Sequence, residues 1–368
     1  MQTITIDCEV TSLRAPGKRA GLAGVGPGVT VKFGLDVHAE QITVCRQIEG
    51  RLPQPAQKRS WPECLAWIEA HVQAGARVHT CYEAGPCGYG LHRQVTALGV
   101  TNLVVAPQKW DEQGQRVKTD KRDARALCQR LDRYVLGNTE VFAVVRVPTP
   151  EQEQRRALCR QRGTLLKERQ RCVVRGHGLM LHHGVQAPSG WWEPANWPKL
   201  AAALPGWLRA HVQSWQEQAL RFEAEVQALQ PAIEALATDQ VQPKGMGALT
   251  TAVLDAEILD WHRFQNRRQV GSYTGLCPGE HTSGNSRRQG GVTKHGNPRV
   301  RHFLVEAAWR LVTWQPDYPP LRWLRLARGK RARKRAIVAV ARRLAVDLWR
   351  IRTGQCSAGQ LGLTLRDC

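Results

Sequence analysis

Two aspartates, Asp120 and Asp123, stand three residues apart in a segment that is otherwise rich in lysine and arginine. The apolar residues that follow, as far as Leu131, recur at helical spacing, which predicts a helix whose positions i and i+3 share one face. The two carboxylates would then point in the same direction, as ligands of a hard cation such as Mg²⁺ must. The alternative is a solvated first helical turn, in which Asp120 caps a helix whose dipole favours negative charge.

Two further acidic residues end predicted strands. Residues 31–38 predict a short strand with Asp36 near its end, and residues 77–82 predict another that stops at Glu83. Open α/β sheets bind ligands beyond the carboxyl ends of their strands, and the Asp120 helix also follows a predicted strand. We therefore expect four carboxylates to converge on one crevice and to hold Mg²⁺ for phosphoryl transfer, with two ions about 3.5–4 Å apart. The four expected ligands are Asp36, Glu83, Asp120 and Asp123.

A third candidate region is residues 272–299, which are rich in glycine, hydroxyl side chains and cations. We predict a long glycine-rich loop, and a loop of this length inside a domain is usually functional or disordered. Glycines would let the backbone approach a phosphodiester, and Ser283, followed by Gly284, is the candidate nucleophile. The alternative for Ser283 is a serine that caps a turn.

The charge of the chain predicts a polyanionic partner. Its 368 residues include 53 Lys and Arg against 31 Asp and Glu, a formal charge of +22 that is spread over the whole length. Nucleic acid fits best, because distributed cations neutralise its phosphates and release the counterions bound there, which favours binding. The cations that we expect to contact phosphates are Lys118, Lys121 and Arg122 near the acidic pair, and Arg287, Arg288, Lys294, Arg299 and Arg301 in or after the glycine-rich region.

Other features of the composition exclude several classes of protein. No apolar run approaches the length of about eighteen residues that a spanning helix needs, and no signal peptide opens the chain, so we expect no membrane partner. The 11 cysteines are scattered and form no Cys-x-x-Cys pair, which argues against a zinc ribbon. Scattered cysteines without a secretion signal fit a reducing cytoplasm.

The order of elements predicts an α/β region followed by helices. Strands come first, and helices at 61–73 and 89–98 then alternate with further strands, the last at 141–147, which predicts one mixed sheet. Residues 150–236 predict an antiparallel helical hairpin that serves as a spacer or a dimer seam. The expected parts are a flexible leader at 1–30, an α/β catalytic domain at 31–148, a helical coiled-coil linker at 149–240, and a mainly helical C-terminal domain at 241–368 that carries the glycine-rich loop.

Two blocks of the sequence together resemble the DEDD transposases of the insertion-sequence family one-ten. The first block resembles the RuvC-like, ribonuclease H-fold domain of that family, and the second resembles its C-terminal transposase domain. The first comprises Gly34-Leu35-Asp36, Tyr82-Glu83-Ala84 and Lys118-Thr119-Asp120-x-x-Asp123-Ala124. The second comprises Gly275-Leu276-x-Pro278, Ser283-Gly284 and Gly290-Gly291-x-Thr293-Lys294-x-Gly296-Asn297.

The resemblance implies roles and partners that composition and spacing do not give. It implies that the four acids bind Mg²⁺ and that Ser283 is the recombinase nucleophile. It also implies a coiled coil between the two domains, a homo-oligomer (a dimer or a tetramer), and a structured non-coding bridge RNA that pairs with donor and target DNA. Thr282 stands where a second serine is common in the family, so Thr282, and after it Ser286, are the alternative nucleophiles.

We therefore hypothesise a DNA strand transferase in which Ser283 attacks the scissile phosphate and a second DNA hydroxyl resolves the phosphoserine linkage. One rival is a hydrolytic junction resolvase that uses only the acidic cluster and water. Another is a non-catalytic nucleic-acid scaffold whose acids cap helices and turns. A tyrosine recombinase does not fit, because Tyr318 lies between Asp317 and Pro319-Pro320 and no clear Arg-His-Arg set precedes it. We expect the acids and Ser283 to meet only on assembly with nucleic acid.

Overall fold

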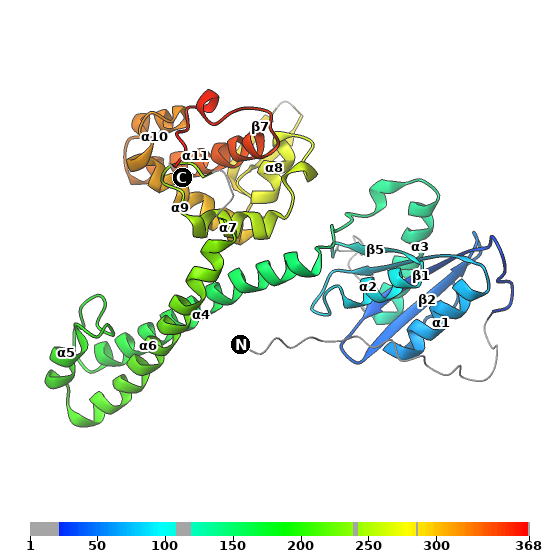
Figure 1. Ribbon diagram of the computed structural model, residues 1–368, viewed down its shortest axis with the longest axis horizontal. Helices are drawn as coiled ribbons and strands as arrows, with labels where there is room; N and C mark the ends of the chain where they lie inside the picture. The colour runs from blue at the N-terminus through cyan, green and yellow to red at the C-terminus, as the bar shows by residue number, and fades with distance from the viewer. Residues whose placement is uncertain (1–21, 108–118, 238–241, 285, 367–368) are drawn as a thin grey trace. The chain divides into compact units, whose positions relative to one another are not determined.

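The chain divides into two compact units, Met1–Val147 and Pro148–Cys368. The computed structural model describes residues 22–107, 119–237, 242–284 and 286–366 (Figure 1). Lys118, one of the predicted phosphate contacts, lies outside the described residues. Within the described ranges, no helix is both long enough and apolar enough to cross a membrane.

A five-stranded mixed sheet forms the centre of the first unit. Its strands are β1 (Thr30–Val37), β2 (Gln41–Ile48), β3 (Gln57–Ser60), β4 (Arg77–Glu83) and β5 (Thr101–Val105). They lie in the order β3-β2-β1-β4-β5, with β2 antiparallel to β1 and β3, and with β1, β4 and β5 mutually parallel. The parallel strands bring their carboxyl ends to one edge of the sheet. This mixed α/β architecture is compatible with the predicted ribonuclease H-like fold.

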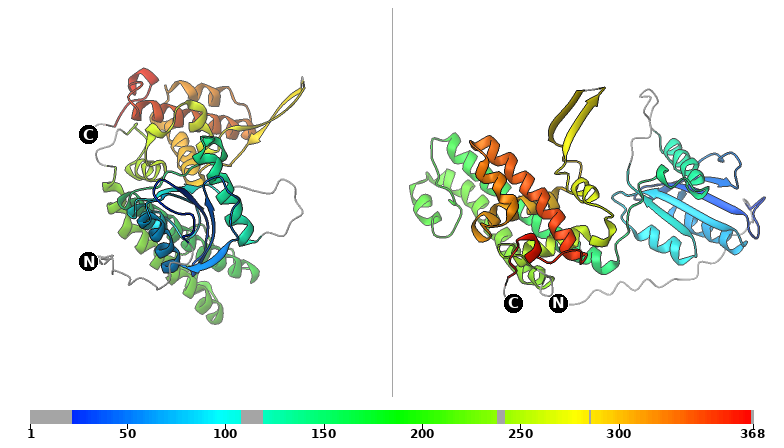
Figure 2. Two further views of the ribbon diagram at one scale, coloured as in Figure 1. Left: turned by 90° about the vertical axis from the view of Figure 1, so that its right-hand side faces the viewer. Right: turned by 90° about the horizontal axis from the view of Figure 1, so that it is seen from above.

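Helices cover both faces of this sheet. Two helices, α1 (Trp61–Gln73) and α2 (Gly90–Ala97), lie on one face, and α3 (Asp120–Val135) lies on the other (Figure 2, right). The side chains of β1 alternate between the two faces, as a strand requires. Val31, Phe33 and Leu35 belong to the core shared with α1 and α2. Lys32, Gly34 and Asp36 therefore face α3.

Helix α3 packs against the backbone of β1 at Gly34. A Cβ atom added to Gly34 would lie 2.3 Å from both the carbonyl oxygen of Ala124 and the amide nitrogen of Cys128. Two residues earlier, the buried Lys32 donates from Nζ to Oδ1 of Asp132 at 2.6 Å. The sequence of β1 thus fixes the position of α3 at two points.

Two sequence predictions for the first unit are wrong in detail. No strand covers residues 141–147, because Thr139–Val141 form a 3₁₀ turn and the described contact with the sheet is an isolated bridge between Val144 and Val105. The predicted leader at 1–30 is also too long. Val25 and Val29 pack against the sheet core, so this part of the predicted leader belongs to the first unit.

We predict that Gly34→Ala lowers the free energy of unfolding of the first unit by about 3 kcal/mol, because the neighbouring atoms are backbone and cannot rotate away. Amide hydrogen exchange across β1 and α3 would measure this unit separately from the second. Gly50→Ala is the control, since an added Cβ there meets nothing within 4 Å. Equal protection in the two variants would contradict the prediction.

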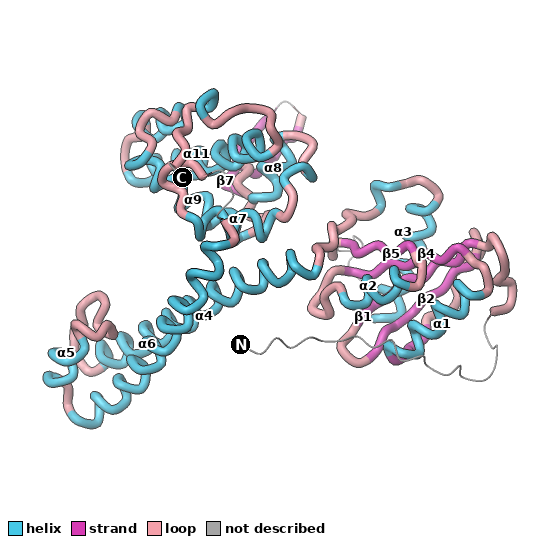
Figure 3. Tube along the Cα trace, viewed as in Figure 1, coloured by secondary structure: helices cyan, strands magenta, loops and turns pink. Residues whose placement is uncertain are grey.

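A long antiparallel helical hairpin begins the second unit. It is formed by α4 (Pro150–His182) and α6 (Gly206–Ala235), with the short α5 (Trp197–Ala203) between them (Figure 3). The antiparallel register is shown by side-chain bonds between Arg162 and Gln230 and between Arg169 and Glu223. Helix α4 begins at a capping box, in which the Thr149 hydroxyl accepts from the amide of Gln152.

The remainder of the second unit is mainly helical. Its helices are α7 (Ala248–Ile258), α8 (Arg267–Thr274), α9 (Pro298–Trp314), α10 (Arg322–Leu326) and α11 (Lys330–Arg352). The apolar faces of α9 and α11 supply most of one core, through residues such as Leu304, Leu311 and Leu344. Helices α10 and α11 are separate because the backbone is extended at Ala327, after the end of α10, and Gly329, with a φ of 81°, precedes α11.

The predicted glycine-rich loop contains a β-hairpin. Strands β6 (Pro278–Ser283) and β7 (Ser286–Val292) pair in antiparallel fashion, with Ser283 opposite Ser286 (Figure 2, right). Gly284 has a φ of 55°, which a two-residue hairpin turn requires. The loop prediction is wrong here. We took the glycines of this segment as evidence of irregular backbone, whereas they lie in the turn and in the strands of the hairpin.

Candidate active site

The carboxyl edge of the sheet meets the first turn of α3. Asp36 is the next-to-last residue of β1, and Asp120 is the first residue of α3. The N-cap is Thr119, so the alternative that Asp120 caps the helix is wrong. Asp123 lies one turn further along the helix. The positive end of the helix dipole stabilises carboxylates in a first turn, which reduces the cost of placing several acids together.

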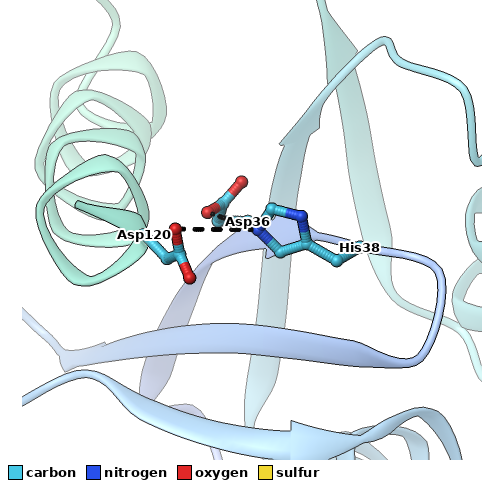
Figure 4. Close-up of side chains that lie close together, drawn as sticks. All are labelled: Asp36, His38 and Asp120. Atoms are coloured by element: carbon cyan, nitrogen blue, oxygen red, sulfur yellow. Dashed lines mark hydrogen bonds and ion pairs between the residues drawn. The ribbon is translucent and has the colours of Figure 1, made fainter. Parts of the chain in front are cut away.

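His38, which we did not predict from the sequence, lies between Asp36 at the end of β1 and Asp120 at the start of α3. Nε2 of His38 is 3.2 Å from Oδ2 of Asp36 and 3.9 Å from Oδ1 of Asp120 (Figure 4). The ligand atoms of these three residues all lie within 4.8 Å of one another. The spacing Asp-x-His at the end of a strand could have revealed His38, because positions i and i+2 share a face. On the helix side, Nζ of Lys58 is 3.5 Å from Oδ2 of Asp120.

The electrostatics of this cluster favour a bound cation. Burial raises the pKa of Asp36, and the negative charges of Asp120 and Asp123 raise it further, while His38 opposes them. A divalent cation would remove the repulsion between the carboxylates that raises this pKa. Carboxylate oxygens are the ligands that Mg²⁺ prefers, so the acidic residues fit the predicted metal.

Glu83 lies at the same edge and on the same face of the sheet. Leu35 of β1 is paired with Tyr82 of β4, so Glu83 stands in register beside Asp36. Tyr82 packs in the core under α1 and α2, and Cys81 packs beside α3, so alternation directs Glu83 to the α3 face. Neighbouring strands are about 4.8 Å apart. The strand pairing therefore places Glu83 at the same edge as Asp36, and its membership of one ligand set with Asp36, Asp120 and Asp123 remains a prediction.

Ser283 belongs to the second unit, at the turn end of β6. Its side chain is exposed, as is that of Ser286 across the hairpin. The hydroxyl of Thr282 donates to Oε1 of Glu280 at 3.0 Å, so it is the more restrained of the three candidate hydroxyls. Arg288 stands opposite His281 on the neighbouring strand. The turn therefore exposes two serine hydroxyls beside a basic strand.

Glycines of the second motif block lie at the root of this hairpin, by which we mean residues 273–277 and 293–297, where its two legs meet the helices. A Cβ atom added to Gly296 would lie 2.2 Å from the carbonyl oxygen of Tyr273, and one added to Gly275 would lie 2.6 Å from the amide nitrogen of Gly296. The amide of Lys294 also donates to the carbonyl of Gly275 at 3.1 Å. These glycines let two backbone segments touch, so their role is to hold the two legs of the hairpin together.

The predicted phosphate contacts have different surroundings. Lys121 and Arg122 lie exposed in the first turn of α3. Arg301 donates from Nη1 to the carbonyls of Thr274 and Lys294, at the root of the hairpin. Arg299 is 3.9 Å from the buried Glu257. Arg299 and Arg301 thus contact the protein itself, and a role for them in binding phosphates remains a prediction.

Comparison with known proteins identifies the class of the chain. A family model described as the transposase IS116/IS110/IS902 family matches residues 242–320. The y4rJ protein of Sinorhizobium fredii, named as a transposase, is 34% identical over 303 residues, which are 73% of this chain and 75% of that protein. The y4qE protein of the same organism, also named as a transposase, is 31% identical over 290 residues, 75% of this chain and 66% of its own length.

A more distant relative extends the comparison to another organism. The transposase for insertion sequence element IS1111A of Coxiella burnetii is 27% identical over 292 residues, which are 75% of this chain and 78% of that protein. These matches define the chain as a transposase, an enzyme that cleaves DNA and transfers strands. It belongs to the IS116/IS110/IS902 family.

We predict that Asp120→Asn weakens the binding of Mg²⁺ or Mn²⁺ by about tenfold or more, because affinity for a hard cation depends on the number of charged ligands. Isothermal titration calorimetry on the metal-free protein would measure the change without reference to activity. Glu69→Gln, which removes an exposed carboxylate from α1, is the matched control. Unchanged affinity in Asp120→Asn would show that the cluster does not bind the metal.

Proposed function

We propose that this transposase cleaves and joins DNA through a covalent link to Ser283, with a metal ion held by the acids of the first unit. The observation that carries the proposal is the cluster of Asp36, His38 and Asp120 at one sheet edge, whose ligand atoms lie within 4.8 Å of one another. The exposed hydroxyl of Ser283 supports the second part. We further propose that the sheet is of the RuvC-like type that the resemblance implies.

The chemistry divides between the two groups of residues. The acids would hold Mg²⁺, which would supply positive charge to the phosphate in the transition state. The Ser283 oxygen loses its proton and forms a bond to phosphorus, and the leaving DNA oxygen takes up a proton. The hydroxyl of a second DNA strand then loses its proton, attacks the same phosphorus and forms the new phosphodiester, and the released Ser283 oxygen takes up a proton. Each step exchanges one phosphate ester for another, so no nucleotide triphosphate is needed.

Cations of the second unit support the binding of DNA. The first two turns of α11 contain exposed basic side chains at Lys330, Arg331, Arg333, Lys334 and Arg335. Positive charge at the start of a helix is unfavourable, because the helix dipole is positive there. The first turn of α11 contains no acidic residue to offset this charge. A phosphate backbone along this surface would relieve the repulsion.

We predict that Ser283→Ala reduces strand transfer by roughly 10³-fold or more, while binding of DNA and Mn²⁺ stays within about twofold of the parent protein. The measurement is transfer of labelled DNA together with detection of a covalent protein–DNA adduct. Thr282→Val and Ser286→Ala are the matched controls, since both neighbouring hydroxyls are removed in turn. Full activity of Ser283→Ala would exclude the covalent role of this serine.

The same experiment separates the rival hypotheses. A hydrolytic resolvase that uses only the acids would keep its cleavage activity in Ser283→Ala and would form no adduct. A non-catalytic scaffold would show no cleavage in the parent protein and no loss in Asp120→Asn. The transposase family of this chain disfavours the scaffold.

We also propose that a structured non-coding RNA guides the enzyme to donor and target DNA in the cytoplasm, and that a dimer or tetramer assembles on the DNA. The net charge of +22 supports a polyanionic partner, and RNA meets this requirement as DNA does.

We predict that one discrete RNA co-purifies with the protein after nuclease treatment, and that its unpaired loops match the sequences flanking the element. Sequencing of the protected RNA is the measurement. A heterogeneous population without such matches would contradict guidance by RNA.

A further inference from the structure

A buried carboxylate lies in the second unit, outside the acidic cluster. Glu257 is the next-to-last residue of α7, and its side chain is 1% exposed. Its two oxygens accept a pair of hydrogen bonds from Arg160 of α4, at 2.8 Å from Nε and 2.9 Å from Nη2. Oε2 also accepts from Nδ2 of Asn297 at 2.9 Å. The carboxylate thus joins α4 and α7 to the residue that precedes α9.

The charge of Glu257 is maintained by these partners. Burial raises its pKa, but the hydrogen bonds from Arg160 and Asn297 and the positive charges of Arg160 and Arg156 outweigh burial, so the pKa lies below its usual value. Replacing a buried ion pair by apolar residues of similar volume is often neutral or stabilising. Packing alone therefore does not require a carboxylate here. A carboxylate is required to hold the Arg160 guanidinium and the Asn297 side-chain amide in one fixed arrangement around Glu257.

Glu257 contacts both legs of the β6–β7 hairpin. Asn297, which follows β7, donates its side-chain amide to the carboxylate, and Tyr273, which precedes β6, donates its hydroxyl to the Glu257 carbonyl at 2.6 Å. The two legs are also joined directly, because the amide of Asn297 donates to the carbonyl of Tyr273 at 2.7 Å. Asn297 then caps α9 by accepting from the amides of Arg299 and Val300. One residue of α7 therefore fixes the place where the hairpin leaves the helices.

The root is important because the strands beyond it have little support. Side chains of β6 are exposed on both faces apart from a half-buried Gly279, and the hairpin extends away from the helices of its unit (Figure 2, right). An isolated two-stranded hairpin is marginally stable at best. The direction in which Ser283 is presented therefore depends on how firmly residues 273–277 and 293–297 are held.

We propose that Glu257 is a positioning residue for strand transfer, which fixes the root of the β6–β7 hairpin and so the direction of Ser283. This inference rests on the proposed role of Ser283. Because Arg160 belongs to α4, the same carboxylate ties the hairpin root to the long helical hairpin. Glu257 itself touches no DNA in this role and acts only through Asn297 and Tyr273.

The test compares Glu257→Gln with Asp255→Asn in the full-length protein. Asp255 lies on the same helix and is bonded to Arg352 and Trp261, which lie outside the hairpin root. Glutamine keeps the size of Glu257 but presents an amide NH₂ in place of one carboxylate oxygen, so the contact with Arg160 or with Asn297 is lost. Arg160→Gln is a second variant that removes the other partner of the pair, at a side chain that is 42% exposed.

Amide hydrogen exchange of Thr293, Lys294 and Asn297 reports the root directly, since these amides donate to Cys277, Gly275 and Tyr273. We expect their exchange to accelerate about tenfold or more in Glu257→Gln, less in Arg160→Gln, and not in Asp255→Asn. We also expect kcat for strand transfer to fall about tenfold or more in Glu257→Gln with KM for DNA within about twofold. Unchanged exchange in Glu257→Gln, or an equal increase in Asp255→Asn, would overturn the inference.

The exchange measurement separates this inference from the proposed function. If the root loosens in Glu257→Gln but kcat falls no further than in Asp255→Asn, the positioning role in transfer is overturned, whatever the nucleophile. If the root loosens and kcat falls although the parent protein forms no adduct at Ser283, the hairpin is positioned as proposed, and the covalent role of Ser283 is what fails.

Discussion

The contact between α3 and the backbone of β1 is the constraint on which the acidic site depends. Gly34 has no side chain, and the carbonyl of Ala124 and the amide of Cys128 occupy the space where a Cβ atom would lie. The residues on either side of Gly34 on this face, Lys32 and Asp36, lie near opposite ends of α3. Lys32 bonds Asp132 near the far end of α3, and Asp36 lies beside the first turn. A helix displaced from Gly34 would carry Asp120 away from Asp36.

This packing places Asp36 where its charged form is disfavoured. Burial and neighbouring negative charge both raise the pKa of Asp36, and the available compensation is the helix dipole together with His38 and Lys58. A fold optimised for stability alone would replace one of these acids. Proteins commonly retain such local conflicts at functional sites and offset them elsewhere, here by the close fit of α3 on the sheet.

Strong local patterns in the sequence predicted most of the first unit. The strand-end positions of Asp36 and Glu83 and the helix that carries Asp120 and Asp123 follow from periodicity and from the rule for ligand sites in open sheets. His38 was missed because a single histidine after a strand is common, and only the pairing of β1 with its neighbours shows what it faces. The strand predicted at 141–147 failed because an apolar run of this length does not show whether a partner strand is free.

The second unit was predicted less well for a different physical reason. Glycine marks loops, but it also marks places where two backbones touch, and Gly275 and Gly296 belong to the latter kind. Their neighbour Asn297 is bonded to the protein through its side chain. The role of Glu257 could not be read from the sequence at all, because its three partners come from α4, α8 and the residue before α9.

The two units thus fix their reactive groups by different means. In the first, a carboxylate from a strand and one from a helix are brought together by direct backbone packing. In the second, the hydroxyl proposed as nucleophile stands at the end of an exposed hairpin whose position is set only at its base. A metal site tolerates small errors in ligand position poorly, whereas a nucleophile must reach a phosphate whose place is set by the bound DNA. A rigid acidic edge and a hairpin held only at its root are consistent with these two requirements.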